Sequence, residues 1–264
     1  TAFGWAALRE RVLHLPTAAA MQIHAPTPAP TAAIPTAAPE AADGWQVRHD
    51  GHVPIAGGVL VTPKSFTTKQ GDYDLIIHFH GNRHIVAESV EHAGINAALA
   101  IINVGIRSAP YRNLFQSPES FDQLLRQIDR GLLRRGVRKP TLRRLALISW
   151  SAGYGAIESI LQYRHSPPPE SDPLDAIIAL DGVHGGFVDG DPTRLSERTM
   201  AAFLNAARGA AQGTLLVSLT HSEIDPIEYG STKRAQEYIL GAVGGRPNRG
   251  PMLPMPPTLA LESA

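Results

Sequence analysis

The feature that most constrains the fold of this chain is a series of short, largely apolar runs, each followed directly by small or polar residues. The runs cover residues 75–79, 98–104, 145–148, 176–180 and 214–219. Runs of this length that are apolar at successive positions are typical of strands buried on both faces of a sheet. Because segments with helical spacing separate them, they predict an α/β fold, with a mostly parallel central sheet and helices on both faces.

The intervening segments carry the periodicity and the start signals of helices. The clearest helix begins at Ser117-Pro118, a capping serine followed by a proline at the first helical position. Its apolar residues recur at helical spacing, namely Phe121, Leu124, Leu125, Ile128 and Leu132. Further helices are expected at about 85–93, 156–161, 194–209 and 231–240.

The composition divides the chain into four parts. Residues 1–15 predict a short amphipathic helix, and residues 16–43 are rich in Ala, Pro and Thr, which favours a linker or an extended arm. Residues 44–240 form the expected α/β domain, which opens with a hairpin of strands at 45–48 and 58–63. Residues 241–264 form a C-terminal segment rich in Pro and Gly.

The composition also excludes several classes of function. Lys plus Arg and Asp plus Glu both total 24, so the net charge does not indicate binding to nucleic acid or to an anionic membrane. The absence of cysteine excludes disulfides, thiol catalysis and cysteine metal sites. No apolar run approaches the ~20 residues that span a bilayer, so no membrane span is expected. The chain starts at Thr1, and a Pro-rich arm near the start is common in exported proteins, which favours a periplasmic or extracellular location.

Polar residues gather where the predicted strands end. They lie at 78–82, 106–108, 151, 181–184 and 220–225. In sheets of this kind ligands bind outside the carboxyl ends of the strands. We therefore expect the functional site at this edge of the sheet.

The run 145–148 leads into Ser149-Trp150-Ser151-Ala152-Gly153, and a helical pattern follows at once. Small residues beside Ser151 suit a sharp strand-to-helix turn, because a larger side chain would collide with neighbouring backbone. A serine at such a turn holds its hydroxyl above the sheet, near N–H groups at the start of the helix that stabilise negative charge. The alternative is that Ser149 and Ser151 only cap the helix.

The pentapeptide resembles the nucleophile elbow of the α/β-hydrolase superfamily, usually G-x-S-x-G, with Ser149 in place of the first glycine. The order of a His-Gly loop, the elbow and two acid-bearing loops is similar to that family over residues 45–240. Segments 180–184 and 220–223 are also similar to a poorly described bacterial branch of it. The resemblance implies a serine hydrolase that cleaves an ester or an amide through an acyl-serine intermediate at Ser151.

In that family a His-Gly loop contributes to the oxyanion hole. Here the resemblance assigns this role to the loop of His80, through the N–H of Gly81 or Asn82, together with the N–H of Ala152. Each such donor supplies about 3 kcal/mol to the transition state. The alternative for His80 is a strand-end histidine bonded to backbone. Trp150 flanks the nucleophile and is a candidate for the wall of an acyl pocket.

A serine hydroxyl needs a base within hydrogen-bond reach, and the base needs an orienting acid. Asp181 is the favoured acid, because its strand is expected beside the elbow strand. Asp225, with Glu223 beside it, is the alternative, since it follows the next strand, where the family usually keeps its acid. Either aspartate also suits an ordinary turn.

The catalytic base is the part of the α/β-hydrolase pattern that this sequence does not match. The family places its histidine after the last strand, yet no histidine follows His221 in this chain. Either His221 or His184 has taken the role, or the base lies outside this chain. In the second case the last strand and its histidine either were cut off from this chain or belong to another polypeptide that completes the sheet. The sheet of this chain is then expected to end at the strand 214–219 or to be completed by a partner.

Three further interpretations compete with the serine hydrolase. His78, His80 and His84 lie at the end of a buried strand, with spacing similar to that of a metal-dependent hydrolase. A hydrolase fold kept as a non-catalytic binding module is a second alternative. A dinucleotide-binding domain is excluded because no G-x-G-x-x-G follows an early strand, and no cofactor is expected.

The substrate class is open between a small ester or amide and an acyl or peptide substrate. Tyr154 beside the elbow is a candidate wall of the site. Arg107, Tyr111 and Arg112 follow another predicted strand and are candidates for binding a polar or carboxylated substrate.

Overall fold

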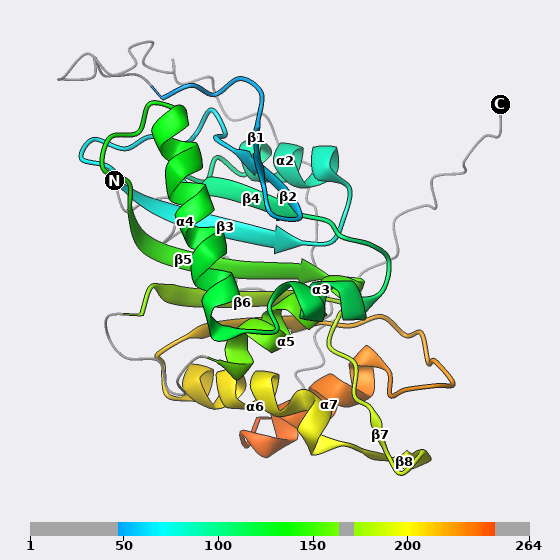
Figure 1. Ribbon diagram of the computed structural model, residues 1–264. Coiled ribbons are helices and arrows are strands. Elements are labelled where there is room, and N and C mark those ends of the chain that lie inside the picture. The colour runs from blue at the N-terminus through cyan, green and yellow to red at the C-terminus, as the bar shows by residue number, and fades with distance from the viewer. Residues whose placement is uncertain (1–46, 164–171, 246–264) are drawn as a thin grey trace, which may run out of the picture.

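The computed structural model describes residues 47–163 and 172–245, and these contain the expected α/β fold. A seven-stranded sheet has the order β1-β2-β4-β3-β5-β6-β9 (Figure 1). Its strands are β1 (Val53–Ile55), β2 (Gly58–Val61), β3 (Asp72–Phe79), β4 (Ala98–Ile102), β5 (Thr141–Trp150), β6 (Leu174–Leu180) and β9 (Leu216–Thr220). Strands β4, β3, β5, β6 and β9 are parallel, whereas β1 and β2 pair in antiparallel fashion at one edge. The prediction of a mostly parallel central sheet is confirmed.

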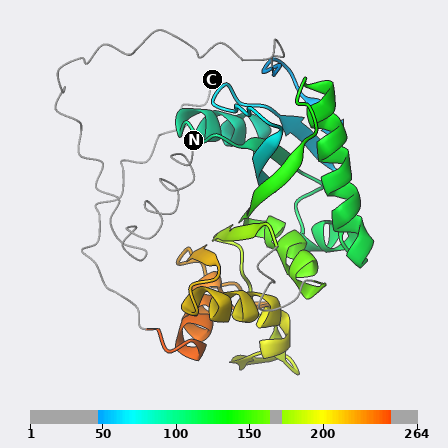
Figure 2. The same cartoon turned by 90° about the vertical axis from the view of Figure 1, so that its left-hand side faces the viewer.

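Helices cover both faces of the sheet. They are α2 (Arg83–His92), α3 (Ser108–Leu114), α4 (Pro118–Arg134), α5 (Tyr154–Gln162), α6 (Glu197–Ala211) and α7 (Thr232–Ala242). Figure 2 shows α2 on one side of the sheet and α4 on the other. Buried side chains of α3, α4, α5, α6 and α7 join one apolar cluster, and α2 packs on a second cluster across the sheet. None of the described helices has the length and apolar character needed to cross a membrane.

Helix α4 follows the sequence pattern closely. Ser117 occupies the position before its first residue, and Pro118 begins the helix. Phe121, Leu124 and Ile128 turn toward the sheet and are almost fully buried. Because the helix connects β4 to the parallel strand β5, it runs antiparallel to the strands and ends at their amino edge.

The opening hairpin differs from the expected one. Val47 and Arg48 are not part of a strand, and the hairpin consists of β1 and β2 instead. The N–H of Arg48 donates to the carbonyl of Arg135 at the end of α4, and its carbonyl accepts from the hydroxyl of Thr62. These contacts lay the segment along the domain without strand pairing. The remaining residues of the predicted strand lie outside the described residues.

Two elements were missing from the sequence prediction. A small antiparallel hairpin, β7 (Phe187–Val188) and β8 (Asp191–Leu195), follows β6. Helix α3 contains Pro110, which argues against a helix in a short polar segment. The proline lies in the first turn, however, where a missing N–H breaks no intrahelical bond.

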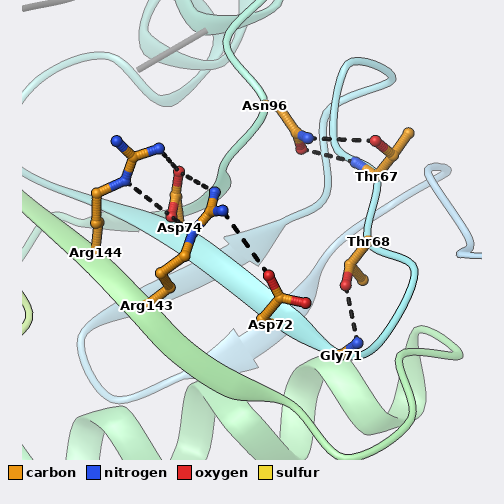
Figure 3. Close-up of polar contacts among 8 residues, drawn as sticks. All are labelled: Thr67, Thr68, Gly71, Asp72, Asp74, Asn96, Arg143 and Arg144. Carbon is orange, nitrogen blue, oxygen red and sulfur yellow. Dashed lines mark hydrogen bonds and ion pairs between the residues drawn. The ribbon is translucent and has the colours of Figure 1, made fainter. Parts of the chain in front are cut away.

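A buried carboxylate marks the amino ends of the two central strands. Asp74 on β3 is 3% exposed, and its two oxygens accept from both Arg143 and Arg144 of β5 (Figure 3). Neighbouring residues of a strand normally point to opposite faces. The register of β3 against β5 shifts between Tyr73 and Asp74, and such a bulge re-aims a side chain. Both guanidinium groups therefore reach one carboxylate.

Other expectations concern the ends of the chain. The helix at 1–15, the arm at 16–43 and residues 246–264 lie outside the described residues. Within 47–163 and 172–245, the sheet ends at β9, where the outer edge of that strand pairs with no other strand.

Candidate functional site

The elbow at Ser151 is a sharp strand-to-helix turn. Strand β5 ends at Trp150, a single 3-10 turn covers Ser151–Gly153, and α5 begins at Tyr154. Ser151 has a φ of 44°. This left-handed conformation costs a residue other than glycine about 1–2 kcal/mol. Ser151 is therefore held in a strained backbone conformation at the carboxyl edge of the sheet.

Glycines allow the surrounding backbone to approach the elbow closely. A Cβ atom added to Gly153 would lie 2.2 Å from the carbonyl oxygen of Phe79. One added to Gly182 would lie 2.8 Å from the carbonyl oxygen of Ser151. The elbow is thus wedged between the ends of β3 and β6. The sequence analysis did not predict this contact. Gly182, directly after Asp181, is the residue that could have indicated it.

The loop of His80 lies beside the elbow and is firmly anchored. The His80 ring stacks on Trp150 with centroids 5.2 Å apart, and its Nδ1 lies 2.8 Å from the hydroxyl of Tyr111. The side chain of Asn103 donates to the carbonyl of Gly81 at 2.9 Å. Among the described residues, the N–H groups of Gly81 and Asn82 donate no hydrogen bond.

Tyr111 and Arg112 serve the scaffold rather than an open surface. Tyr111 is fully buried, and its hydroxyl bonds His80, Asn103 and the carbonyl of Gly105. Arg112 forms an ion pair with Glu158 at 2.6 Å and donates to the hydroxyls of Ser108 and Tyr154. Arg107, just before α3, is exposed. The suggestion that Tyr111 binds substrate is wrong, because its hydroxyl is used inside the protein.

Asp181 has one oxygen fully engaged and the other open. Its Oδ1 accepts from the N–H of Ser222 at 2.8 Å and from the hydroxyl of Thr232 at 2.7 Å. Burial alone would raise the pKa of this carboxyl, but these hydrogen bonds outweigh burial and hold the pKa below its ordinary value. Within the described part of the chain, Oδ2 accepts no hydrogen bond.

Among the described residues, neither candidate base forms a hydrogen bond with the serine. No described side chain forms a hydrogen bond with the Ser151 hydroxyl, whereas His221 places its Nδ1 3.3 Å from the carbonyl oxygen of Ser222. The ring of His184 lies between Tyr154 and Tyr229, with centroid distances of 5.6 and 4.8 Å. Burial lowers the pKa of His184, and the charge of Asp181 opposes that effect only in part.

The other acid candidates lie at the surface. Asp225 and Glu223 are both exposed in the loop after β9. Glu223 forms an ion pair with Lys233 at 2.8 Å and lies 3.9 Å from the Nδ1 of His221. Gly182 thus brings the segment after Asp181 close to Ser151. Asp225 forms no hydrogen bond with any described residue.

The three histidines near β3 do not converge on one point. His78 is buried in the strand, His80 stacks on Trp150, and His84 is exposed in α2. No group of three His, Asp or Glu side chains among residues 47–163 and 172–245 is arranged to hold a metal ion. The proposed His78/His80/His84 ligand set is therefore not formed in this arrangement.

Comparison with known proteins adds no assignment of function. No protein-family model and no curated protein matches the sequence. Among solved structures, TT1662 from Thermus thermophilus has a TM-score of 0.35 at 18% identity, over 75% of this chain and 83% of that chain. LpqC, a poly(3-hydroxybutyrate) depolymerase from Bordetella parapertussis, has a TM-score of 0.33 at 12% identity, over 73% and 85%.

The histone deacetylase Clr3 has a TM-score of 0.32 at 10% identity, and the match covers 75% of this chain. This chain spans only 36% of the length of Clr3. Likeness at this level carries no argument about the function of this chain. The chemistry of the site therefore rests on its own geometry.

Proposed function

We propose that this chain is a serine hydrolase that cleaves an ester or an amide through an acyl-serine intermediate at Ser151. The observation that carries the proposal is the φ of 44° at Ser151, directly after a buried strand and before a helix. Strain of this kind persists only where surrounding structure imposes it, and it gathers at functional sites. A serine that only capped the helix would have no need of it.

In the proposed reaction a base takes the proton of the Ser151 hydroxyl as its oxygen attacks a carbonyl carbon, and the carbonyl oxygen becomes an oxyanion. The N–H of Ala152 and that of Gly81 or Asn82 would donate to this oxygen. Two donors aimed at the developing charge supply about 3 kcal/mol each. Collapse of the intermediate breaks the ester or amide bond, and the departing alcohol or amine takes the proton from the base. Water, activated by the same base, then attacks the acyl-serine, releases a carboxylic acid and restores the Ser151 hydroxyl.

Asp181 is the proposed orienting acid. A carboxylate in this role needs one oxygen fixed by the protein and the other free to accept the N–H of an imidazole. The contacts from Ser222 and Thr232 to Oδ1 meet the first need, and the open Oδ2 meets the second. Asp225 has no comparable support.

For the base we propose an imidazole from outside the described residues. His221 and His184 make no hydrogen bond to Ser151 or to Asp181 among the described residues. His184 follows β6, which is adjacent to the elbow strand, and His221 follows β9, one strand further out. The unpaired outer edge of β9 is where a second polypeptide would complete the sheet and bring a histidine. Rearrangement of His221, or of His184, is the alternative.

The runner-up function is a binding module that keeps the hydrolase fold without catalysis. The observation that favours it is the lack of any imidazole within hydrogen-bond distance of Ser151 among the described residues. A serine without a base is a weak nucleophile. The two functions differ in the reactivity of one hydroxyl group.

A fluorophosphonate probe tests this reactivity. We expect labelling of the chain, measured by intact mass, to be abolished in Ser151→Ala and retained in Ser149→Ala. Ser149 is the matched control, because its hydroxyl is fully buried and makes no hydrogen bond with any described residue. The reaction is run with and without added imidazole, which is small enough to act as a diffusible base beside Asp181.

The pattern of labelling separates the alternatives. Labelling that requires added imidazole indicates a base outside this chain, and labelling without it assigns the base to a histidine of this chain. No labelling under either condition, in a sample with a cooperative unfolding transition, would leave the binding module as the better account. Labelling that survives in Ser151→Ala would contradict the assignment of the nucleophile.

Thr232 provides an independent test of the proposed acid. In Thr232→Val the hydroxyl that donates to Asp181 is lost, while the shape of the side chain is nearly kept. A hydrogen bond to a charged group contributes about 1.5–3 kcal/mol, so we expect labelling of Ser151 to slow roughly tenfold or more. The pKa of the Asp181 carboxyl should rise at the same time, measured by NMR titration.

The control for this prediction is Thr232→Ser, which keeps the hydroxyl and should restore both the labelling rate and the low pKa. An unchanged labelling rate in Thr232→Val, with the pKa of Asp181 raised, would mean that Asp181 is not the acid.

A further inference from the structure

The neutral net charge of the chain conceals a strongly basic segment. Residues 126–144 contain eight of the 24 lysine and arginine residues and only one acid, Asp129. The segment comprises the second half of α4, the following turn and the start of β5. That single acid accepts a hydrogen bond from the buried Tyr73 hydroxyl at 2.7 Å.

Three of these cations form a line along α4. Arg126, Arg130 and Arg134 are spaced four residues apart, and all three are exposed. We call them the arginine stripe. Side chains at this spacing are neighbours on one helix face, about 5–6 Å apart, and the stripe rises about 12 Å along the axis. Among the described residues none of the three forms an ion pair.

The basic surface continues past the end of the helix. Arg138 and Lys139 are exposed in the turn between α4 and β5. Arg143 and Arg144 bind the buried Asp74, and Arg143 also lies 3.8 Å from Asp72 (Figure 3). Acids therefore offset the charge of the last pair, whereas no acid among the described residues is paired with the arginine stripe.

The stripe lies on the outer side of the protein. The opposite face of α4 is buried against the sheet, and Figure 1 shows the helix lying across that face. A helix packed along its whole length presents only its outer face to a partner. It can lie flat against a surface.

The exposed Leu133 helps to distinguish between nucleic acid and a lipid surface as the partner of the arginine stripe. This side chain is 53% exposed and lies beside Arg130 and Arg134 on α4. No aromatic residue between 126 and 144 is available for stacking on bases, which single-stranded nucleic acid commonly requires. An apolar side chain among arginines, with no stacking platform, suits a plane of anionic headgroups above hydrocarbon.

We propose that the arginine stripe docks the protein on an anionic phospholipid surface. Guanidinium groups bind phosphate through paired hydrogen bonds, and a polybasic surface is attracted by the negative potential of such a membrane. The proposal is independent of the reaction at Ser151. Because the stripe occupies the half of α4 near the amino edge of the sheet, the carboxyl edge with Ser151 would stay open to water.

The test is sedimentation of the full chain with lipid vesicles. We expect binding to phosphatidylcholine vesicles that contain phosphatidylglycerol, little binding to pure phosphatidylcholine, and loss of binding as salt is raised. Each basic residue near such a surface contributes roughly a fivefold gain in binding. The triple variant Arg126→Gln, Arg130→Gln and Arg134→Gln should therefore bind roughly 100-fold more weakly.

A matched triple variant removes the same charge elsewhere, through Arg83→Gln, Arg194→Gln and Arg208→Gln. These residues are exposed on α2, β8 and α6, so this variant should bind like the parent. Equal binding by the two triple variants would overturn the proposal, as would equal binding to both kinds of vesicle. Tighter, salt-sensitive binding of a single-stranded oligonucleotide than of anionic vesicles would assign the surface to nucleic acid instead.

Discussion

Replacing Gly153 by alanine is expected to lower the free energy of unfolding by about 3 kcal/mol or more, the upper part of the range for overpacked sites. The added methyl carbon would lie 2.2 Å from the carbonyl oxygen of Phe79 and 3.0 Å from the Cβ of His80. The nearest atom is backbone of the central strand β3, which cannot rotate away as the end of a flexible side chain would. Either the elbow or the His80 loop must move, and Ser151 moves with the elbow.

Urea unfolding followed by circular dichroism measures this effect. The control is Gly241→Ala in α7, where an added methyl carbon meets nothing within 4 Å. There alanine should be neutral or stabilising by up to about 1 kcal/mol, because it favours the helix. Equal stability of the two variants would show that β3 does not press on the elbow.

The second expected result concerns pH. Burial in β3 lowers the pKa of His78 from 6.5 to about 4, assisted by repulsion from His80, with a backbone hydrogen bond acting in the opposite direction. As the pH falls below about 6.5, the unfolded chain takes up this proton while the folded protein does not. The stability that His78 contributes is therefore complete above pH 6.5 and is lost as the pH approaches 4. The loss amounts to about 3 kcal/mol.

Unfolding curves collected between pH 7.5 and about 4 compare the parent with His78→Leu. Burial also lowers the pKa of His80 and His184, so the parent loses stability from more than one source. His78→Leu should lose distinctly less over this interval, and His92→Leu, at an exposed position in α2, should follow the parent. Parallel curves for all three proteins would mean that His78 takes up its proton in the folded state.

The sequence was sufficient to predict the parallel sheet, because apolar runs and helical stripes depend on local spacing alone. The same holds for α4, whose start and apolar face are both visible in the residue pattern. Helix α3 was not predictable in this way, since its stability comes from Tyr111 buried beneath the loop of His80. That contact joins residues that follow the carboxyl ends of β3 and β4, and it therefore depends on how these two strand ends lie in the folded protein.

The candidate site was predictable in part. Its edge of the sheet and the turn at Ser151 follow from polar residues placed after buried strands. The support of Asp181 by Thr232 could not be foreseen, because 51 residues separate the two side chains and only the docking of α7 brings them together. The pairing of a base with Ser151 stays a prediction.

The carboxylate shared by Arg143 and Arg144 has a consequence for folding fidelity. If β5 paired with β3 one residue out of place, Asp74 would be shut into the sheet without its two cations, at the cost of several kcal/mol. The same error would turn the side chains of β5 to the opposite face and misplace the serine at its end. Asp74 thus favours the one register of β3 against β5 that also places the serine at the elbow.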